Sequence, residues 1–403
     1  MHFTLLTQYY PPEIGAPPAR LSQLTQYFIR RGHSVSVLTA MPNYPLGQIY
    51  PGYGGLVRRE EMDGMEVIRT FIYPTQQTDY LRRLMNYFSF VLSSATVGSA
   101  LLGRTDYLFV ESPPLFLGLS GFWLRWLKRA RLIFNVSDLW PESAVQLGVL
   151  RRDSLLHRMS LQLEAFYYRR AWLITGQSKS ILADISSRFP NYPTFHISNG
   201  VDTTVFHPQQ HSEQTRWLRK GNEDCLVLYA GLHGLAQGLD QVLSVAETLQ
   251  DDKKLRFALI GDGLEKPALM QQAHQSGLSN VDFYDPRPAA EIPALLTAAD
   301  ILVVTLKQYI PGAVPSKLYE AMASGRPVIL VASGEAADIV RTHKAGIVVE
   351  PGNVTAFVKA VQTLREDPIE RRVLGENGRR AAVAHYDRST FVNRFIDYLE
   401  ANL

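Results

Sequence analysis

The sequence has one cysteine, a low charge content and no recognisable leader segment. Cys225 is the only cysteine among 403 residues, which excludes a disulfide framework and a thiolate metal cluster and favours a reducing compartment. The first residues, MHFTLLTQYYPP, lack a basic segment followed by a long apolar stretch, so we expect no secretory signal. With 46% hydrophobic and 20% charged residues, the chain is globular, and its length predicts two or three domains.

Short runs rich in Val, Ile, Leu and Phe alternate with longer helical patterns. The runs lack polar alternation, which is typical of strands buried on both faces of a parallel sheet. The pattern predicts an α/β protein with two Rossmann-like domains in tandem. The expected strands are 3–7, 35–39, 67–72, 107–111, 132–136, 172–175 and 195–198 in the first half, and 226–230, 256–260, 281–284, 301–306, 328–331 and 347–349 in the second.

A polar stretch separates the two series of strands. We expect an N-terminal domain over 1–205, a linker over 206–224 and a C-terminal domain over 225–387. The final segment, 388–403, has a helical pattern that could pack back on the N-terminal domain, although the sequence leaves either domain open.

The N-terminal half has features of a membrane-facing surface. It contains 20 Lys and Arg against 14 Asp and Glu, whereas residues 206–403 contain 21 against 24. Segment 84–103 has no charge and is just long enough to span a bilayer, but its Asn, Ser and Thr residues favour a buried or interfacial helix. Segment 116–134 mixes Phe, Leu and Trp with four basic residues, which suits either an anionic membrane surface or a helix with one face in the core.

The loop after the first strand is a candidate phosphate site, because ligands of such domains bind at the carboxyl ends of the strands. Gly15 precedes a helix expected to start at Pro17 or Pro18, whose N-terminus can hold a diphosphate. The loop lacks the glycine spacing of a dinucleotide fingerprint, so a nicotinamide cofactor is weakly supported. A purely geometric Pro-rich turn is the alternative.

The second half carries further loop signals. Glycines follow two of its strands, in AGLHGLAQGLD (230–240) and in GDG (261–263). In VPSKLYEAMASGRPVI (314–329), Ser316 is a plausible helix N-cap, Lys317 can meet phosphate, and Glu320 can accept both hydroxyls of a ribose. A capped helix with a surface Lys and Glu is the alternative.

Taken in order, these motifs resemble the retaining, nucleotide-sugar-dependent glycosyltransferases of family 4. The resemblance covers nearly the whole chain and implies the GT-B fold, in which two Rossmann-like domains with parallel sheets face each other across a cleft. DLWPES (138–143) and ESPPLF (111–116) further resemble the bacterial branch that builds O-antigen, colanic acid and exopolysaccharide, including fucosamine-type transferases. The motifs are PPEIGAPPARL, RRGHSVSVLTAMPNYP, SNGVDTTVF, YAGLHGLAQGLD, LIGDG, VPSKLYEAMASGRPVI and AGIVVEPGN.

The resemblance implies a set of donor-binding residues. Gly15 and Ala16 would lie against the diphosphate, Glu320 would bind ribose, and the loops at Gly263 and Arg287 would border the base. The full expected set is Gly15, Ala16, Gly231, His233, Gly263, Arg287, Ser316, Lys317, Leu318 and Glu320.

The chain also departs from the family pattern. Many members carry two glutamates eight positions apart; Glu320 matches the second, but Gly312 stands at the position of the first. Leu232 and Gln237 replace an Arg and a Lys that commonly meet the diphosphate. Phosphate charge would then be met by backbone N–H groups, Lys317, and His233 or Arg287.

Candidate catalytic carboxylates follow strands of the N-terminal domain. Asp138, Glu111 and Glu13 could orient or deprotonate an acceptor hydroxyl, and Glu111 occupies a position where a histidine is common in the family. The sequence has no Asp-x-Asp motif, which could hold a divalent metal ion. Two carboxylates with this spacing occur only at Glu61 and Asp63, in a polar turn, so we expect no metal.

The sequence therefore predicts a retaining, metal-independent transferase. We expect a UDP-linked donor, such as that of an N-acetylated hexosamine, and a polyprenyl-diphosphate-linked or glycan acceptor. We expect a cytoplasmic protein at the anionic inner face of the membrane, with no further cofactor and no nucleic acid partner. A UDP-N-acetylglucosamine 2-epimerase-like enzyme and a non-catalytic GT-B regulatory subunit are the alternatives.

Overall fold

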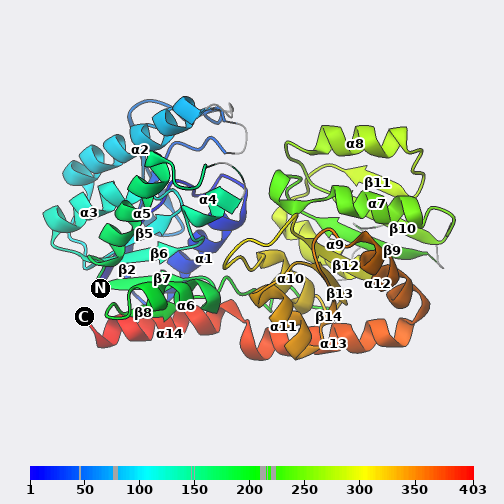
Figure 1. Ribbon diagram of the computed structural model, residues 1–403. Helices are drawn as coiled ribbons and strands as arrows, with labels where there is room; N and C mark the ends of the chain where they lie inside the picture. The colour runs from blue at the N-terminus through cyan, green and yellow to red at the C-terminus, as the bar shows by residue number, and fades with distance from the viewer. Residues whose placement is uncertain are drawn as a thin grey trace. The chain divides into compact units, whose positions relative to one another are not determined.

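The protein folds into two compact units, each built around one sheet (Figure 1). The computed structural model describes residues 1–44, 47–75, 80–146, 148, 150–208, 215, 217, 218 and 224–403. The first unit comprises residues 1–199 and 389–403, and the second comprises residues 200–388. Most of the expected linker, 206–224, lies outside the described residues.

The first unit contains an eight-stranded sheet in the order β3-β4-β2-β1-β5-β6-β7-β8. All neighbours are parallel except β3, which pairs antiparallel with β4. Each expected first-half strand has an observed counterpart, but β3 was not expected, because its sequence VRREEM is polar and mostly exposed. The strands are β1 (His2–Leu6), β2 (Ser34–Ala40), β3 (Val57–Met62), β4 (Met65–Thr70), β5 (Tyr107–Ser112), β6 (Arg131–Val136), β7 (Leu173–Gly176) and β8 (Thr194–His196).

Helices cover both faces of this sheet. Neighbouring residues of β1, such as Leu5 and Leu6, enter different apolar clusters, because successive side chains of a strand point to opposite faces. The last helix, α14, belongs to the first unit: its Phe395 and Leu399 pack in the cluster that contains Phe3. The helices are α1 (Ala16–Arg30), α2 (Tyr80–Leu101), α3 (Leu117–Lys128), α4 (Glu142–Gln146), α5 (Leu155–Tyr168), α6 (Lys179–Arg188) and α14 (Arg388–Ala401).

The second unit has a six-stranded, fully parallel sheet in the order β11-β10-β9-β12-β13-β14. All six expected strands are present. The order reverses between β9 and β12, so the carboxyl ends of these two strands form the crevice where α/β sheets bind ligands. The strands are β9 (Cys225–Ala230), β10 (Leu255–Ile260), β11 (Val281–Tyr284), β12 (Ile301–Thr305), β13 (Val328–Val331) and β14 (Gly346–Val349).

Seven α-helices are described in this unit. Trp217 and Leu218, which fall within the expected linker, pack against the core of the unit. The predicted α/β class with two mainly parallel sheets is therefore confirmed. The helices are α7 (Asp240–Thr248), α8 (Lys266–Gln275), α9 (Ile292–Ala298), α10 (Ser316–Ala323), α11 (Glu335–His343), α12 (Val354–Glu366) and α13 (Pro368–His385).

Helix α2 contains the apolar segment noted in the sequence. Leu84–Leu101 has a mean hydropathy of 1.2 and is the one helical segment among the described residues that is long and apolar enough to cross a membrane, with 28% of it buried. It packs beside α3, where Gly98 lies under Leu124.

Helix α3 approaches its neighbours closely through two glycines. A Cβ at Gly118 would lie 2.5 Å from the Tyr167 ring, and one at Gly121 would lie 2.5 Å from a methyl group of Val110. Both contacts are shorter than real Cβ atoms show, so the helix can sit this close only without side chains there.

We expect Gly118→Ala to lower the free energy of unfolding by about 1–3 kcal/mol, because overpacking outweighs the helix preference of alanine. Urea unfolding followed by tryptophan fluorescence measures this in the first unit, which holds four of the five tryptophans. Gly103→Ala is the control, since its Cβ would meet nothing within 4 Å. Equal stability of the two variants would contradict the packing argument.

Candidate functional site

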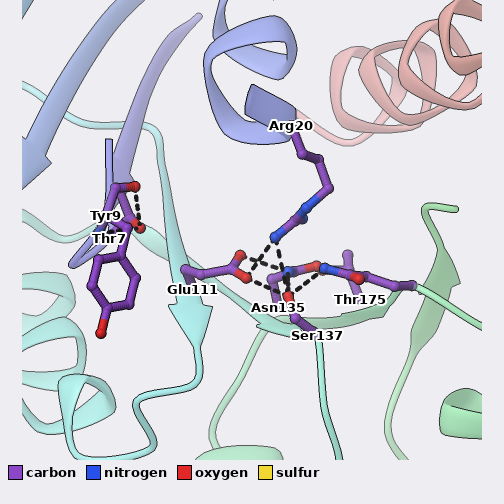
Figure 2. Close-up of polar contacts among 8 residues, drawn as sticks. Thr7, Tyr9, Arg20, Glu111, Asn135, Ser137 and Thr175 are labelled. Carbon is purple, nitrogen blue, oxygen red and sulfur yellow. Dashed lines mark hydrogen bonds and ion pairs between the residues drawn. The ribbon is translucent and has the colours of Figure 1, made fainter. Parts of the chain in front are cut away.

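A buried polar network lies at the carboxyl ends of β5, β6 and β7 in the first unit (Figure 2). The Arg20 guanidinium forms an ion pair with Glu111 at 2.6 Å and donates to the Ser137 hydroxyl at 3.1 Å. The Asn135 amide donates to the other carboxylate oxygen of Glu111 at 2.7 Å, and Thr175 donates to the Asn135 carbonyl at 2.7 Å.

This network engages both carboxylate oxygens of Glu111. Ser137 also donates to the oxygen that Arg20 contacts, so the carboxylate has three donors. Glu111 was predicted as a candidate catalytic carboxylate, but its observed contacts serve to fix Arg20 and Ser137. The Ser137 hydroxyl donates its one hydrogen to Glu111 and already accepts from Arg20 and Asn135, so Arg20 is the group of this network that could meet a substrate.

Asp138 follows β6, the strand beside that of Glu111, and has a different environment. Burial raises the pKa of its carboxyl, and hydrogen bonds from the Ser143 side chain and the Leu139 N–H partly oppose this rise. A carboxyl with a raised pKa can exchange a proton nearer neutral pH, so Asp138 is the better candidate for acid–base work.

Glu13 holds two loops together. Its carboxylate accepts the backbone N–H groups of Tyr10 at 3.1 Å, Asn43 at 2.9 Å and Tyr44 at 2.8 Å. Burial raises its pKa, and these three hydrogen bonds act in the opposite direction. The contacts give Glu13 a positioning role in the loop that leads to Gly15.

Gly15 and Ala16 lie at the start of α1, as the sequence predicted. Gly15 is the N-cap, Ala16 is exposed, and prolines occupy the next two positions. No side chain caps this helix start, but the prolines have no N–H and the Ala19 N–H donates to the Gly15 carbonyl, so a bound anion could meet only the N–H groups of Gly15 and Ala16.

In the second unit, the glycine-rich loops after β9 and β10 touch each other. An added Cβ at Gly261 would lie 1.8 Å from the Gly231 carbonyl oxygen, and one at Gly263 would lie 2.3 Å from the His233 carbonyl oxygen. Lys317 of α10 lies directly against Gly231, with its Cε 1.9 Å from where a Cβ would be. The predicted residues Gly231, Gly263 and Lys317 are therefore brought together.

Glu320 lies one turn after Lys317. Its carboxylate forms no hydrogen bond or ion pair with any of the described residues. Burial raises its pKa, while the positive charges of Lys317 and Arg388 act in the opposite direction. A partly buried carboxylate without a donor is suited to receive hydroxyl groups from a ligand.

His233 cannot supply the phosphate charge that the sequence suggested. The side chain is fully buried, and its ring lies 5.9 Å from the Tyr229 ring and 6.4 Å from the Phe283 ring. Burial and the charge of Lys266 lower its pKa to about 4, so the ring is neutral at pH 7. The Ile260 carbonyl lies near the ring, but neither ring nitrogen forms a hydrogen bond with a described residue.

Ser316 and Leu318 differ from expectation. Pro315 is the N-cap of α10, and Ser316 is the first helical residue, without a capping hydrogen bond. The Leu318 side chain is fully buried in the core, and its N–H already donates to the Pro315 carbonyl at 3.0 Å. Leu318 therefore supports the helix rather than offering a group to a ligand.

Arg287 lies on the exposed loop after β11. Its guanidinium stacks on Trp217 at 4.2 Å from the ring centroid, and that ring meets Tyr284 edge-on at 4.7 Å. The loop thus carries an aromatic and cationic surface that could border a planar base.

The structure shows the surroundings of two residues, Gly312 and Leu232, that depart from the family pattern. Gly312 has φ of +76°, a conformation that side chains rarely adopt, so a glutamate could not simply replace it. Leu232 is exposed and supplies no charge of its own, so Lys317 is the cation that lies beside Gly231.

Lys266 is a site residue that the sequence analysis missed. Its ammonium group is buried and donates to the Gly261 carbonyl at 2.9 Å, the Tyr284 carbonyl at 3.1 Å and Asp285 at 3.0 Å. It ties the loops after β10 and β11 together. A lysine in the first helical turn, where a cation is unfavourable, was the available signal.

Within the described ranges, no group of three or more His, Cys, Asp or Glu side chains could hold a metal ion.

Two family models match the chain, one in each half. "Glycosyl transferase 4-like domain" matches residues 15–200, and "Glycosyl transferases group 1" matches residues 211–381.

Individual relatives agree with these matches. The Escherichia coli K12 protein WcaI, named for glycosyl transfer in colanic acid biosynthesis, is 26% identical over 411 residues, covering 96% of this chain and 97% of its own. The structure is similar to sucrose-phosphate synthase of Thermosynechococcus elongatus, with TM-score 0.77, 18% identity and 99% and 98% coverage. It is also similar to Anabaena HepE in complex with UDP and glucose, with TM-score 0.74, 19% identity and full coverage of both chains. At these identities the two structures show a shared fold.

We expect the His233 imidazole to stay neutral between pH 8 and about pH 5.5, and to titrate with a midpoint near pH 4. Side-chain NMR of the full chain measures this, with exposed His274 as the reference signal and a His233→Gln variant for assignment. A His233 midpoint above pH 6 would restore it as a source of phosphate-binding charge.

Proposed function

Because the chain belongs to the family 4 glycosyltransferases with the two-domain GT-B fold, we propose that it transfers a sugar from a UDP-sugar to a lipid-linked or glycan acceptor in cell-surface polysaccharide synthesis. We propose that transfer retains the anomeric configuration, needs no metal ion, and takes place in the cytoplasm at the inner face of the membrane. The relative named for colanic acid biosynthesis supports the polysaccharide assignment. The complex of HepE with UDP and glucose supports a UDP-linked donor.

The observation that carries the proposal is the arrangement of Glu320 and Lys317 at the switch point of the second sheet. The Glu320 carboxylate, which has no partner among the described residues, would receive the ribose hydroxyls. Lys317 lies one turn earlier against Gly231, where a diphosphate would approach the backbone. The Trp217, Tyr284 and Arg287 surface would then receive the base.

The chemistry needed is stabilisation of the leaving diphosphate. Negative charge grows on it as the bond to the sugar breaks, and the Lys317 ammonium and the N-terminus of α10 are fixed positive groups that could oppose that charge. Asp138, with its raised pKa, is the proposed carboxyl that orients the acceptor hydroxyl or receives its proton. Arg20, held by Glu111, is the proposed cation for an acceptor phosphate.

We expect Glu320→Gln and Lys317→Ala each to weaken UDP binding about tenfold or more, because each removes a charged hydrogen-bonding partner. Isothermal titration calorimetry with UDP and GDP, with and without EDTA, measures this and identifies the nucleotide. Glu366→Gln and Lys359→Ala are the matched controls, since both residues are exposed on α12.

Unchanged UDP affinity in Glu320→Gln would refute the ribose assignment. Failure of the wild-type protein to bind any nucleotide would favour the regulatory-subunit alternative.

An apolar surface with basic neighbours supports the membrane assignment. Leu92 of α2 is 67% exposed and Trp126 of α3 is 68% exposed, and α2 and α3 pack side by side. Arg129 is exposed beside them. Exposed tryptophan next to basic side chains is typical of binding to an anionic membrane interface. The large exposed apolar residues of the two helices are Met85, Phe88, Leu92, Leu119, Trp123, Trp126 and Leu127.

We expect Trp123→Ala/Trp126→Ala to reduce binding to phosphatidylglycerol-containing vesicles at least fivefold, because each ring contributes buried apolar area at the interface. Vesicle flotation measures this. Leu264→Ala/Ile369→Ala is the control, since both residues are more than 70% exposed in the second unit. Equal losses in both double variants would contradict a specific membrane face.

A further inference from the structure

The second unit has a cavity of about 750 Å³ whose walls are rich in arginine. Asp300 and Pro327 line it, and they immediately precede β12 and β13. The cavity is therefore at the amino ends of these parallel strands, on the sheet edge opposite the one that carries the nucleotide candidates. The residues lining it are Pro208, Asp300, Gly325, Arg326, Pro327, Pro368, Arg371, Arg372, Glu376, Arg379 and Arg380.

Three of the five arginines are held in place by neutral backbone carbonyls. Arg326 donates to the Thr297 carbonyl at 3.0 Å, Arg371 to the Arg365 carbonyl at 3.1 Å, and Arg379 to the Ala323 carbonyl at 3.1 Å. These carbonyls lie at the ends of α9, α12 and α10. The contacts cap the helices and leave the positive charge of each guanidinium unneutralised.

The remaining two arginines are exposed on α13. Arg380 donates to the Asn377 side chain, and Arg372 has no hydrogen bond to any residue that the structure describes. Together they add two exposed cations to the three held by carbonyls.

Two carboxylates act on this cluster, since the charges of Asp300 and Asp387 raise the pKa of Arg326 and Arg379 respectively, against the larger effect of burial. Among the described residues, none of the five arginines lies within 4.0 Å of a carboxylate oxygen. The lining contains two acidic residues, Asp300 and Glu376, against five arginines. Burial lowers the pKa of Arg326 and Arg379, so the positive charge there is held at a cost that an anion would relieve.

The size and chemistry of the cavity indicate the class of ligand. A volume of 750 Å³ falls within the range of small-molecule pockets, which run from about 300 to about 1,000 Å³. Guanidinium forks match the oxygens of phosphate groups and bind them in pairs of hydrogen bonds.

We propose that this cavity is a second anion site, which binds a small ligand carrying at least two phosphate charges, separate from the candidate nucleotide site. Its phosphate could come from a soluble phosphorylated compound or from a lipid headgroup, because the same guanidinium groups recognise both.

The probe is inorganic pyrophosphate, titrated into the full chain by calorimetry with and without saturating UDP. We expect one binding event that UDP does not compete away, weakened at least tenfold in Arg372→Ala/Arg380→Ala. These two side chains cap no helix, so their loss should leave folding intact, and a circular dichroism melt verifies this. Arg158→Ala/Arg394→Ala is the matched control, since both residues are exposed in the first unit.

Lys317→Ala separates this proposal from the nucleotide assignment. It should keep the UDP-insensitive event, whatever happens to UDP binding. If the UDP-insensitive event is present but identical in Arg372→Ala/Arg380→Ala, the proposal is overturned.

Vesicles distinguish the two sources of phosphate. If pyrophosphate does not bind but Arg372→Ala/Arg380→Ala loses affinity for vesicles containing cardiolipin, whose headgroup carries two phosphates, relative to the control, the site takes a lipid headgroup. If neither soluble nor vesicle binding depends on the two arginines, the proposal fails.

Discussion

The backbone contact between Gly231 and Gly261 is the constraint on which the candidate nucleotide site depends. Parallel strands bring successive loops to one edge of the sheet, and here the loops after β9 and β10 meet without any side chain between them. A methyl group at Gly261 would collide with the Gly231 carbonyl and push the loops apart. Because the Lys317 side chain lies on Gly231, such a shift would also displace the cation. Buried Lys266 ties the loop after β10 to the end of β11 through the carbonyls of Gly261 and Tyr284.

The first unit uses a buried ion pair where the second uses backbone contact. Arg20 and Glu111 have side chains only 10% and 3% exposed, so removing both charges from water is costly. Asn135 and Ser137 offset that cost by donating to Glu111. The arrangement therefore holds Arg20 in one orientation, and it explains why a carboxylate at the end of a strand need not be the reactive one.

The sequence was sufficient for most of the fold because buried parallel strands are continuous apolar runs. Strand β3 was missed because it is an antiparallel edge strand of mostly exposed polar residues. The glycine loops and Lys317 could be predicted from short motifs, because a close approach of two backbone segments requires glycine and phosphate binding favours a cationic side chain. The network around Glu111 could not be, because Arg20 lies 91 positions away in the chain. The burial of the Leu318 and His233 side chains could not be predicted from their motifs, because it depends on how the helices and loops pack in the fold.

Helix α10 places a cation near its own N-terminus. The dipole of a helix favours negative charge at that end, so Lys317 in the first turn is less stable there than a neutral residue would be. A bound diphosphate would interact favourably with both the lysine and the helix dipole. The unfavourable interaction between these two positive groups in the free protein would then be relieved on binding, which would increase the affinity. If Lys317 binds the diphosphate as proposed, stability without nucleotide and affinity for nucleotide are opposed at this side chain, and a substitution that raises the stability of the free protein here would weaken binding.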